Sequence, residues 1–224
     1  MSAPDPAADP LKVRAEFLGL FETPVLHGRV ADHAPLTAAL ATAIRARRAA
    51  DEEGIRRSNI GGWHSATDML QWGGAPARQL ADTTIKLAKR LSHFEERDAA
   101  SVDWSVRMWA NVSPPGALNM SHAHPGVLWA ASYYVDMGRD PGVDTGGEIY
   151  FEDPRFPATL MTFPGFRMVG LDGAPQPVER RLTTQAGDLV LFPAWIRHGV
   201  RPNEGTRDRI SIAMNVYVKE RAGV

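Results

Sequence analysis

The second half of the chain is divided into short strand-like segments, and this division constrains the fold more than any other feature. Beyond about residue 100, apolar or alternating runs such as 105–112, 127–137 and 189–193 are separated by turns rich in glycine, proline and aspartate. Turn signals at intervals of roughly 8–15 residues are typical of an antiparallel sandwich or barrel. We therefore expect an all-β unit over about 101–219.

The first half carries helical patterns. Leucine and isoleucine recur every four residues in the alanine- and arginine-rich stretch 35–51, which predicts a helix that Asp32 caps. A second helix is expected over about 75–96. Before both, an apolar stretch that contains Pro24 is compatible with an edge strand, where proline is tolerated.

Helices followed by an all-β unit predict an α+β fold that is mainly β. We expect a jelly roll with N-terminal helices packed on one sheet. The helical part covers about 31–100 and shares one core with the jelly roll, so that residues 13–224 form a single domain. Residues 1–12, with three prolines in the first ten, are expected to be a disordered tail.

The charge balance and the lack of cysteine exclude several classes of function. Lysine and arginine number 25 against 26 acidic residues, for a net charge of −1, which gives no basis for a nucleic-acid or membrane partner. Without cysteine, any metal must be held by histidine or carboxylates. The N-terminus lacks the features of a signal peptide and no membrane span is evident. We expect a cytoplasmic protein, and the sequence is compatible with a homodimer.

Three histidines carry the strongest chemical signal. One residue separates His122 from His124, so on a strand both imidazoles would point to the same face. His198 follows the strand-like run 189–193 and would bring a third imidazole from a distant strand. Three neutral nitrogen donors suit Fe(II), Zn, Cu or Ni, and the sequence therefore predicts a metal site.

Arg209 and Ser211 are expected to face the same side of the last strand. The forked guanidinium of arginine matches a carboxylate, and a hydroxyl beside it would serve the buried end of a small diacid. Taken alone, Arg209 is better explained by an ion pair with Asp208 or Glu204. Next to a metal site, we interpret it as a carboxylate clamp.

The order of these motifs resembles the 2-oxoglutarate/Fe(II)-dependent oxygenase superfamily. His-x-His-Pro at 122–125 is followed by Phe-Pro-x-Trp-x-x-His at 192–198 and Arg-x-Ser at 209–211. More narrowly, the chain is similar to a group of bacterial and phage 2-oxoglutarate oxygenases with a His-x-His-Pro segment. That resemblance spans about residues 20–218 and includes the segments 21–25, 58–65, 132–135, 151–155 and 209–215.

The resemblance implies a cupin-like double-stranded β-helix that holds Fe(II), with 2-oxoglutarate as cosubstrate. His122 matches the first metal ligand and His198 the last, while Arg209 and Ser211 match the positions that bind the far carboxylate of 2-oxoglutarate. The implied activity is hydroxylation of an unactivated C–H bond in a small-molecule or peptide substrate, with release of succinate and CO₂.

His124 departs from the superfamily pattern, which places a carboxylate two residues after the first histidine. His124 can be a third nitrogen ligand, or it can lie outside the coordination shell of a two-histidine site. Alternatively, Glu148 can supply an oxygen ligand from another strand. We favour the first interpretation, because strand alternation would put His124 beside His122.

Further candidates surround these motifs. Alternation turns one of two adjacent tyrosines inward, and we assign Tyr134, with Asn119, to 2-oxoglutarate. Candidate substrate contacts are Trp63, His64 and Asn215. Two other functions fit the motifs: a cupin-like tri-histidine dioxygenase that does not use 2-oxoglutarate, and a non-catalytic jelly roll that binds a metal or ligand.

Overall fold

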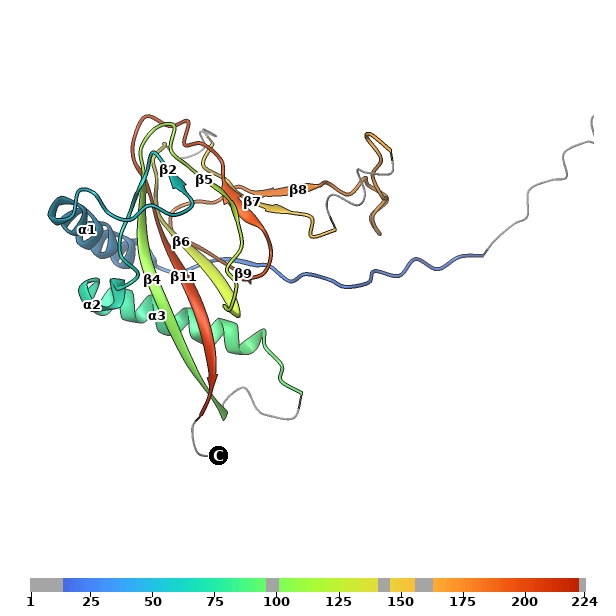
Figure 1. Ribbon diagram of the computed structural model, residues 1–224, viewed down its shortest axis with the longest axis horizontal. Helices are drawn as coiled ribbons and strands as arrows, with labels where there is room; N and C mark the ends of the chain where they lie inside the picture. Colours follow the sequence, from blue (N-terminus) through green and yellow to red (C-terminus); the bar gives the residue numbers. More distant parts are fainter. Residues whose placement is uncertain (1–13, 96–100, 141–145, 156–162, 222–224) are drawn as a thin grey trace, which may run out of the picture.

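The computed structural model of this chain describes residues 14–95, 101–140, 146–155 and 163–221, and in them two antiparallel sheets form the β part (Figure 1). The six-stranded sheet has the order β1 (Leu26–Arg29), β9 (Asp188–Pro193), β6 (Trp129–Met137), β11 (Arg209–Glu220), β4 (Val102–Ser113) and β3 (Trp63–His64). The five-stranded sheet has the order β2 (Asn59–Ile60), β5 (Leu118–His122), β10 (His198–Val200), β7 (Ile149–Glu152) and β8 (Glu179–Leu182). The expected α+β fold, mainly β, is confirmed.

The two longest strands, β4 and β11, lie between the hydrophobic core under the helices and the cavity inside the jelly roll. The two strands pair in register from Arg209 opposite Ser113 to Glu220 opposite Val102. Because side chains alternate along a strand, even-numbered residues of β11 such as Ile212 join the hydrophobic core. Odd-numbered residues such as Ser211 face a cavity instead. One strand thus supplies both core and site.

Three helices cover the outer face of the larger sheet (Figure 1). They are α1 (Ala34–Ala50), α2 (Met69–Trp72) and α3 (Gly74–Arg90). Leu40 of α1 and Leu80 of α3 are almost completely buried in the core that these helices form with the sheet. The hydroxyls of Thr37 and Tyr133 lie 2.7 Å apart and link α1 to β6. Among the described helices, none has both the length and the apolar character needed to cross a bilayer.

The helix boundaries differ from the predicted ones. Asp32 does not cap α1, because its backbone is left-handed (φ 48°) and His33 occupies the N-cap position. The second helix ends at Arg90 rather than near residue 96, and the glycine pair before it separates it from α2. The edge strand is real but short, since β1 covers four residues. The predicted tail at 1–12 lies outside the described residues.

Candidate metal centre

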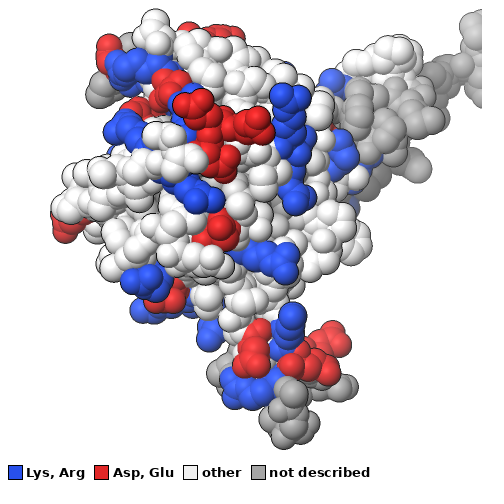
Figure 2. All heavy atoms as spheres, turned by 60° about the vertical axis from the view of Figure 1, so that its left-hand side comes forward, with Lys and Arg blue, Asp and Glu red and all other residues white. Residues whose placement is uncertain are grey.

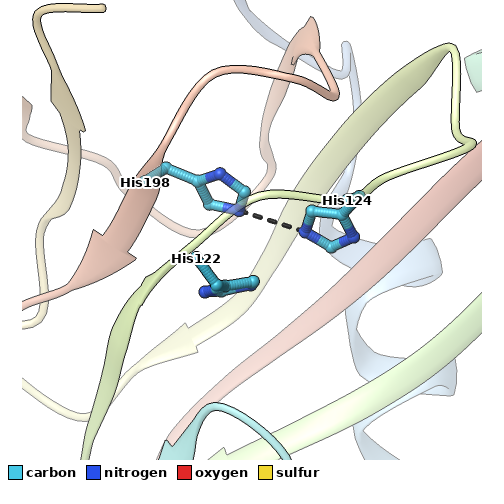
Figure 3. A group of neighbouring side chains, drawn as sticks. All are labelled: His122, His124 and His198. Carbon is cyan, nitrogen blue, oxygen red and sulfur yellow. Dashed lines mark hydrogen bonds between the residues drawn. The ribbon is translucent and has the colours of Figure 1, made fainter.

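The three predicted histidines meet at one end of the smaller sheet. His122 ends β5 and His198 begins β10, and the two are direct cross-strand partners. The candidate donor atoms of His122, His124 and His198 all lie within 4.8 Å of one another. Figure 3 shows the three rings converging, with the Nε2 atoms of His124 and His198 3.3 Å apart. Donors on a common metal at about 2.1 Å lie roughly 3 Å apart, so the spacing fits a metal.

His124 reaches this group from a turn and not from the strand. β5 ends at His122, so the alternation on which we based the prediction does not extend to His124. Instead, the backbone N–H of His124 donates to the Ala194 carbonyl at 2.9 Å, and the Val127 N–H donates back to the His124 carbonyl at 3.2 Å. The expected convergence is present, but the turn produces it.

Backbone carbonyls orient two of the rings. Nδ1 of His122 lies 2.7 Å from the Met120 carbonyl, and Nδ1 of His198 lies 2.9 Å from the Ile196 carbonyl. A carbonyl can only accept, so each Nδ1 carries the hydrogen and each Nε2 keeps a free lone pair. This arrangement is typical of histidines that bind a metal.

The local environment keeps the three imidazoles uncharged. Burial, followed by repulsion from His122, lowers the pKa of His198 to about 3 and that of His124 to about 4. Burial also lowers the pKa of His122. The Asn215 side chain is close enough to His124 to oppose its shift. At neutral pH all three rings are therefore ready to bind a metal without losing a proton.

No described carboxylate belongs to this group, whose possible metal ligands are the three histidines alone. Glu148 lies instead where its charge acts on Arg209 and favours the protonated guanidinium. Of the three interpretations of His124, the structure brings together the residues required by the first.

Arg209 is a buried cation with unused hydrogen-bonding capacity. Its residue surface is 2% exposed, and its Nη1 donates to the Ser211 hydroxyl at 3.3 Å. The guanidinium lies 5.1 Å from the ring centre of Tyr134. The Nε of Arg209 and the hydroxyl of Tyr134 have no hydrogen-bond partner. Desolvation lowers the pKa of Arg209, and a carboxylate at this point would supply both the missing charge and the missing acceptors.

The metal centre and Arg209 open into one cavity of about 440 Å³. His64, Asn119 and Asn215 also line it, as expected of residues that contact a ligand. Asn119 additionally donates to the Ser58 hydroxyl at 3.2 Å.

Trp63 does not reach the cavity: its indole N–H donates to the Asp51 carbonyl, and its ring packs in the core.

Trp109 takes the place on the cavity wall that we had considered for Trp63. Trp109 lines the cavity, and its ring stacks on that of His64 with the ring centres 5.4 Å apart. On its other side it stacks on His124 at 6.3 Å. Strand alternation could have indicated this position, because Trp109 shares the odd-numbered face of its strand with Asn111, which also lines the cavity.

One family model matches the part of the chain that contains the histidines and Arg209. Residues 107–215 match the family model described as "Putative 2OG-Fe(II) oxygenase". A comparison with curated protein sequences gives no match.

Several solved structures share the fold. A prolyl-4-hydroxylase from Pseudomonas putida is 21% identical, with a TM-score of 0.57 over 89% of this chain and 94% of that one. A Trichoplax adhaerens prolyl hydroxylase in complex with a hypoxia-inducible factor peptide is 12% identical, with a TM-score of 0.58 over 86% and 83%. The epimerase SnoN in complex with Fe³⁺, α-ketoglutarate and nogalamycin RO is 16% identical, with a TM-score of 0.60 over 90% and 83%.

Proposed function

Residues 107–215 match the family model of "Putative 2OG-Fe(II) oxygenase" proteins, and we propose that the chain belongs to this family and hydroxylates a C–H bond of its substrate. One observation carries the proposal. Three uncharged histidine nitrogens and a buried arginine that lacks a counter-charge share a single cavity. A metal centre beside a carboxylate clamp is what an enzyme that uses Fe(II) and 2-oxoglutarate requires.

We assign Fe(II) to His122, His124 and His198. The lowered pKa values of His198 and His124 fit a divalent cation, because no proton competes for their donor nitrogens at neutral pH. When both are bound, Fe(II) and 2-oxoglutarate supply the oxidising chemistry, in which dioxygen and the cosubstrate yield succinate, CO₂ and an oxygen atom for the substrate. The protein's three nitrogens carry no negative charge, so a bound Fe(II) keeps its full charge of +2 for anionic ligands.

Arg209, Ser211 and Tyr134 would hold the far carboxylate of 2-oxoglutarate. The unpartnered Nε of Arg209 and hydroxyl of Tyr134 are donors, and a carboxylate is acceptor-only. Charge-assisted bonds of this kind are short and about twice as strong as neutral ones. The Ser211 hydroxyl already contacts the guanidinium and keeps it on the cavity side of β11. Asn119, on the opposite wall, is a further candidate contact.

The wall behind the metal centre is apolar. The ring of Phe192 lies 4.6 Å from that of His198, and Phe151 lies 6.2 Å from it. These rings exclude water from one side of the histidines and so favour their neutral form. His64 and Asn215 occupy the more polar side and are proposed to contact the substrate.

Succinate formation tests the proposal directly. Purified protein incubated aerobically with Fe(II) and 2-oxoglutarate should form succinate, slowly without a primary substrate and faster with one. His198→Ala should abolish the reaction. A metal-loaded protein that forms no succinate, yet oxidises a substrate, would instead indicate a tri-histidine dioxygenase in which Arg209 holds the substrate's own carboxylate.

We also propose the class of substrate and the cellular location. Figure 2 shows cationic and anionic side chains interspersed on the face it presents, without a broad basic area. Together with the net charge of −1, this supports a small-molecule or peptide substrate rather than nucleic acid or a membrane. The lack of cysteine is compatible with the cytoplasm.

A further inference from the structure

We propose that the substrate is an anion, with a carboxylate or phosphate group attached to an apolar body. This inference rests on the proposed function and concerns the outer part of the same cavity. Three arginines line the cavity, Arg57, Arg107 and Arg209, and none of its described lining residues is acidic. A concave wall with cations and no carboxylate concentrates anions.

Arg57 and Arg107 line the cavity without a carboxylate that would neutralise them. Both are exposed, and neither forms an ion pair with a carboxylate of the described residues. Elsewhere on the surface, Arg197, Arg201 and Arg207 each contact a carboxylate within 3.0 Å. Other exposed arginines such as Arg56 also have no ion pair among the described residues, but Arg57 and Arg107 are the exposed cations that line the cavity.

Arg107 lies beside the metal centre. Its direct partner on β11 is Asn215, whose side chain is close to His124. Side chains of cross-strand partners on one face have Cβ atoms about 5 Å apart. The guanidinium of Arg107 also lies 5.3 Å from the ring centre of Tyr217, which lines the cavity too. Arg107 is thus held on the cavity face, two side chains away from a proposed iron ligand.

Arg57 approaches from the loop before β2. It lines the cavity, and its positive charge contributes to lowering the pKa of His64. His64 stacks on Trp109, and Trp109 stacks on His124. On β4, Trp109 follows Arg107 by two residues and so shares its face. The indole is therefore an apolar surface of the cavity wall between His64 and His124, with Arg107 two residues before it on β4 and Arg57 near His64.

The far carboxylate of 2-oxoglutarate, when it is held by Arg209, does not reach Arg57 or Arg107. Asn215, the partner of Arg107, is six residues along β11 from Arg209, which is about 20 Å at roughly 3.4 Å per residue. We assign the anion that Arg57 and Arg107 attract to a second molecule, the substrate. Its apolar body would lie against Trp109, with a C–H bond directed to the histidines.

Pairs of acids and their neutral analogues test the inference. The probes are phenylacetate, 3-phenylpropionate and phenyl phosphate, each paired with its amide or, for the phosphate, with phenol. Binding is measured by calorimetry to protein loaded with Zn(II) and saturated with 2-oxoglutarate, so that Arg209 is occupied. We expect at least one acid to bind about tenfold more tightly than its neutral partner. That advantage should shrink near 1 M salt, where the screening length is about 3 Å.

Variants locate the effect. Arg57→Gln and Arg107→Gln should each weaken binding of the acid about threefold, an equal share of the tenfold advantage, and leave binding of the neutral analogue unchanged. Arg56→Gln is the matched control, because Arg56 is an exposed neighbour on the same loop that does not line the cavity. Equal binding of acid and neutral analogue, no binding of any acid, or an equal loss in Arg56→Gln would overturn the inference. If the unmodified enzyme still forms succinate, the proposed function survives that outcome.

Discussion

Arg209 makes the protein less stable than it would be with an apolar residue at the same place. The guanidinium is buried, its Nε has no partner and its contact with Ser211 is with a neutral hydroxyl. Glu148 attracts it, but Arg139 repels it. We predict that Arg209→Met stabilises the ligand-free protein and abolishes binding of 2-oxoglutarate.

The size of the effect follows from desolvation. Replacing buried charged groups by apolar side chains of similar volume is often stabilising by about 1–4 kcal/mol. For a chain of this length each 1 kcal/mol corresponds to roughly 2–4 °C in the melting temperature. In the unmodified protein, 2-oxoglutarate at about 100 times its Kd should add roughly 2.7 kcal/mol. In Arg209→Met this addition should vanish.

Thermal unfolding with and without 2-oxoglutarate measures both quantities. Arg209→Lys is the matched control, because it keeps the buried charge and loses the forked donors; it should show weak cosubstrate binding and no gain in stability. Metal content should be equal in all three proteins. The reasoning is refuted if Arg209→Met is less stable than the unmodified protein without cosubstrate, or if 2-oxoglutarate still raises its melting temperature.

Three more predictions concern the histidines. His198→Ala should lose Fe(II) in metal analysis, and unchanged metal content would contradict its role as a ligand. His124→Ala should lower metal affinity by about 100-fold or more, whereas Glu148→Gln should not, because Glu148 lies outside the histidine group; the opposite order would make Glu148 the third ligand. The third prediction concerns pH. The folded-state pKa of His198 is lowered to about 3, so the unfolded state binds more protons below about pH 6.5. Stability of the metal-free protein should fall as the pH falls from about 6.5 towards 3, with a contribution from His198 on the order of 4 kcal/mol. In His198→Ala, chemical denaturation should show a smaller loss, and an equal loss would exclude this cause.

The sequence predicted the features that depend on strand periodicity. The shared face of Arg209 and Ser211 follows from alternation, and both side chains do lie together on β11. The strands around 105–112 and 189–193 were recognisable because their apolar runs end at strong turns. In these segments local pattern and tertiary structure agree, so the pattern was sufficient.

Features that depend on tertiary contacts were not predictable in the same way. Trp63 and Trp109 have equally apolar rings, and only the pairing of β3 with β4 sends the first to the core and leaves the second at the cavity. His124 joins its partners through a turn that is fixed by the Ala194 carbonyl, a residue 70 positions away. Arg57 and Arg107 line the same cavity only because the loop before β2 and strand β4 come together in the fold, and the sequence does not show this contact.

The position of His124 in a turn also bears on how this site can evolve. A donor on a paired strand is tied to the register of the sheet, whereas turn positions tolerate substitution more readily. Histidine and aspartate codons differ by one base, so a single mutation would exchange the third nitrogen for the carboxylate that the superfamily usually carries. Neither sheet would need to change its pairing, because the backbone contacts of His124 with Ala194 and Val127 do not involve its side chain. The charge of the metal centre is therefore a property that selection can alter independently of the fold.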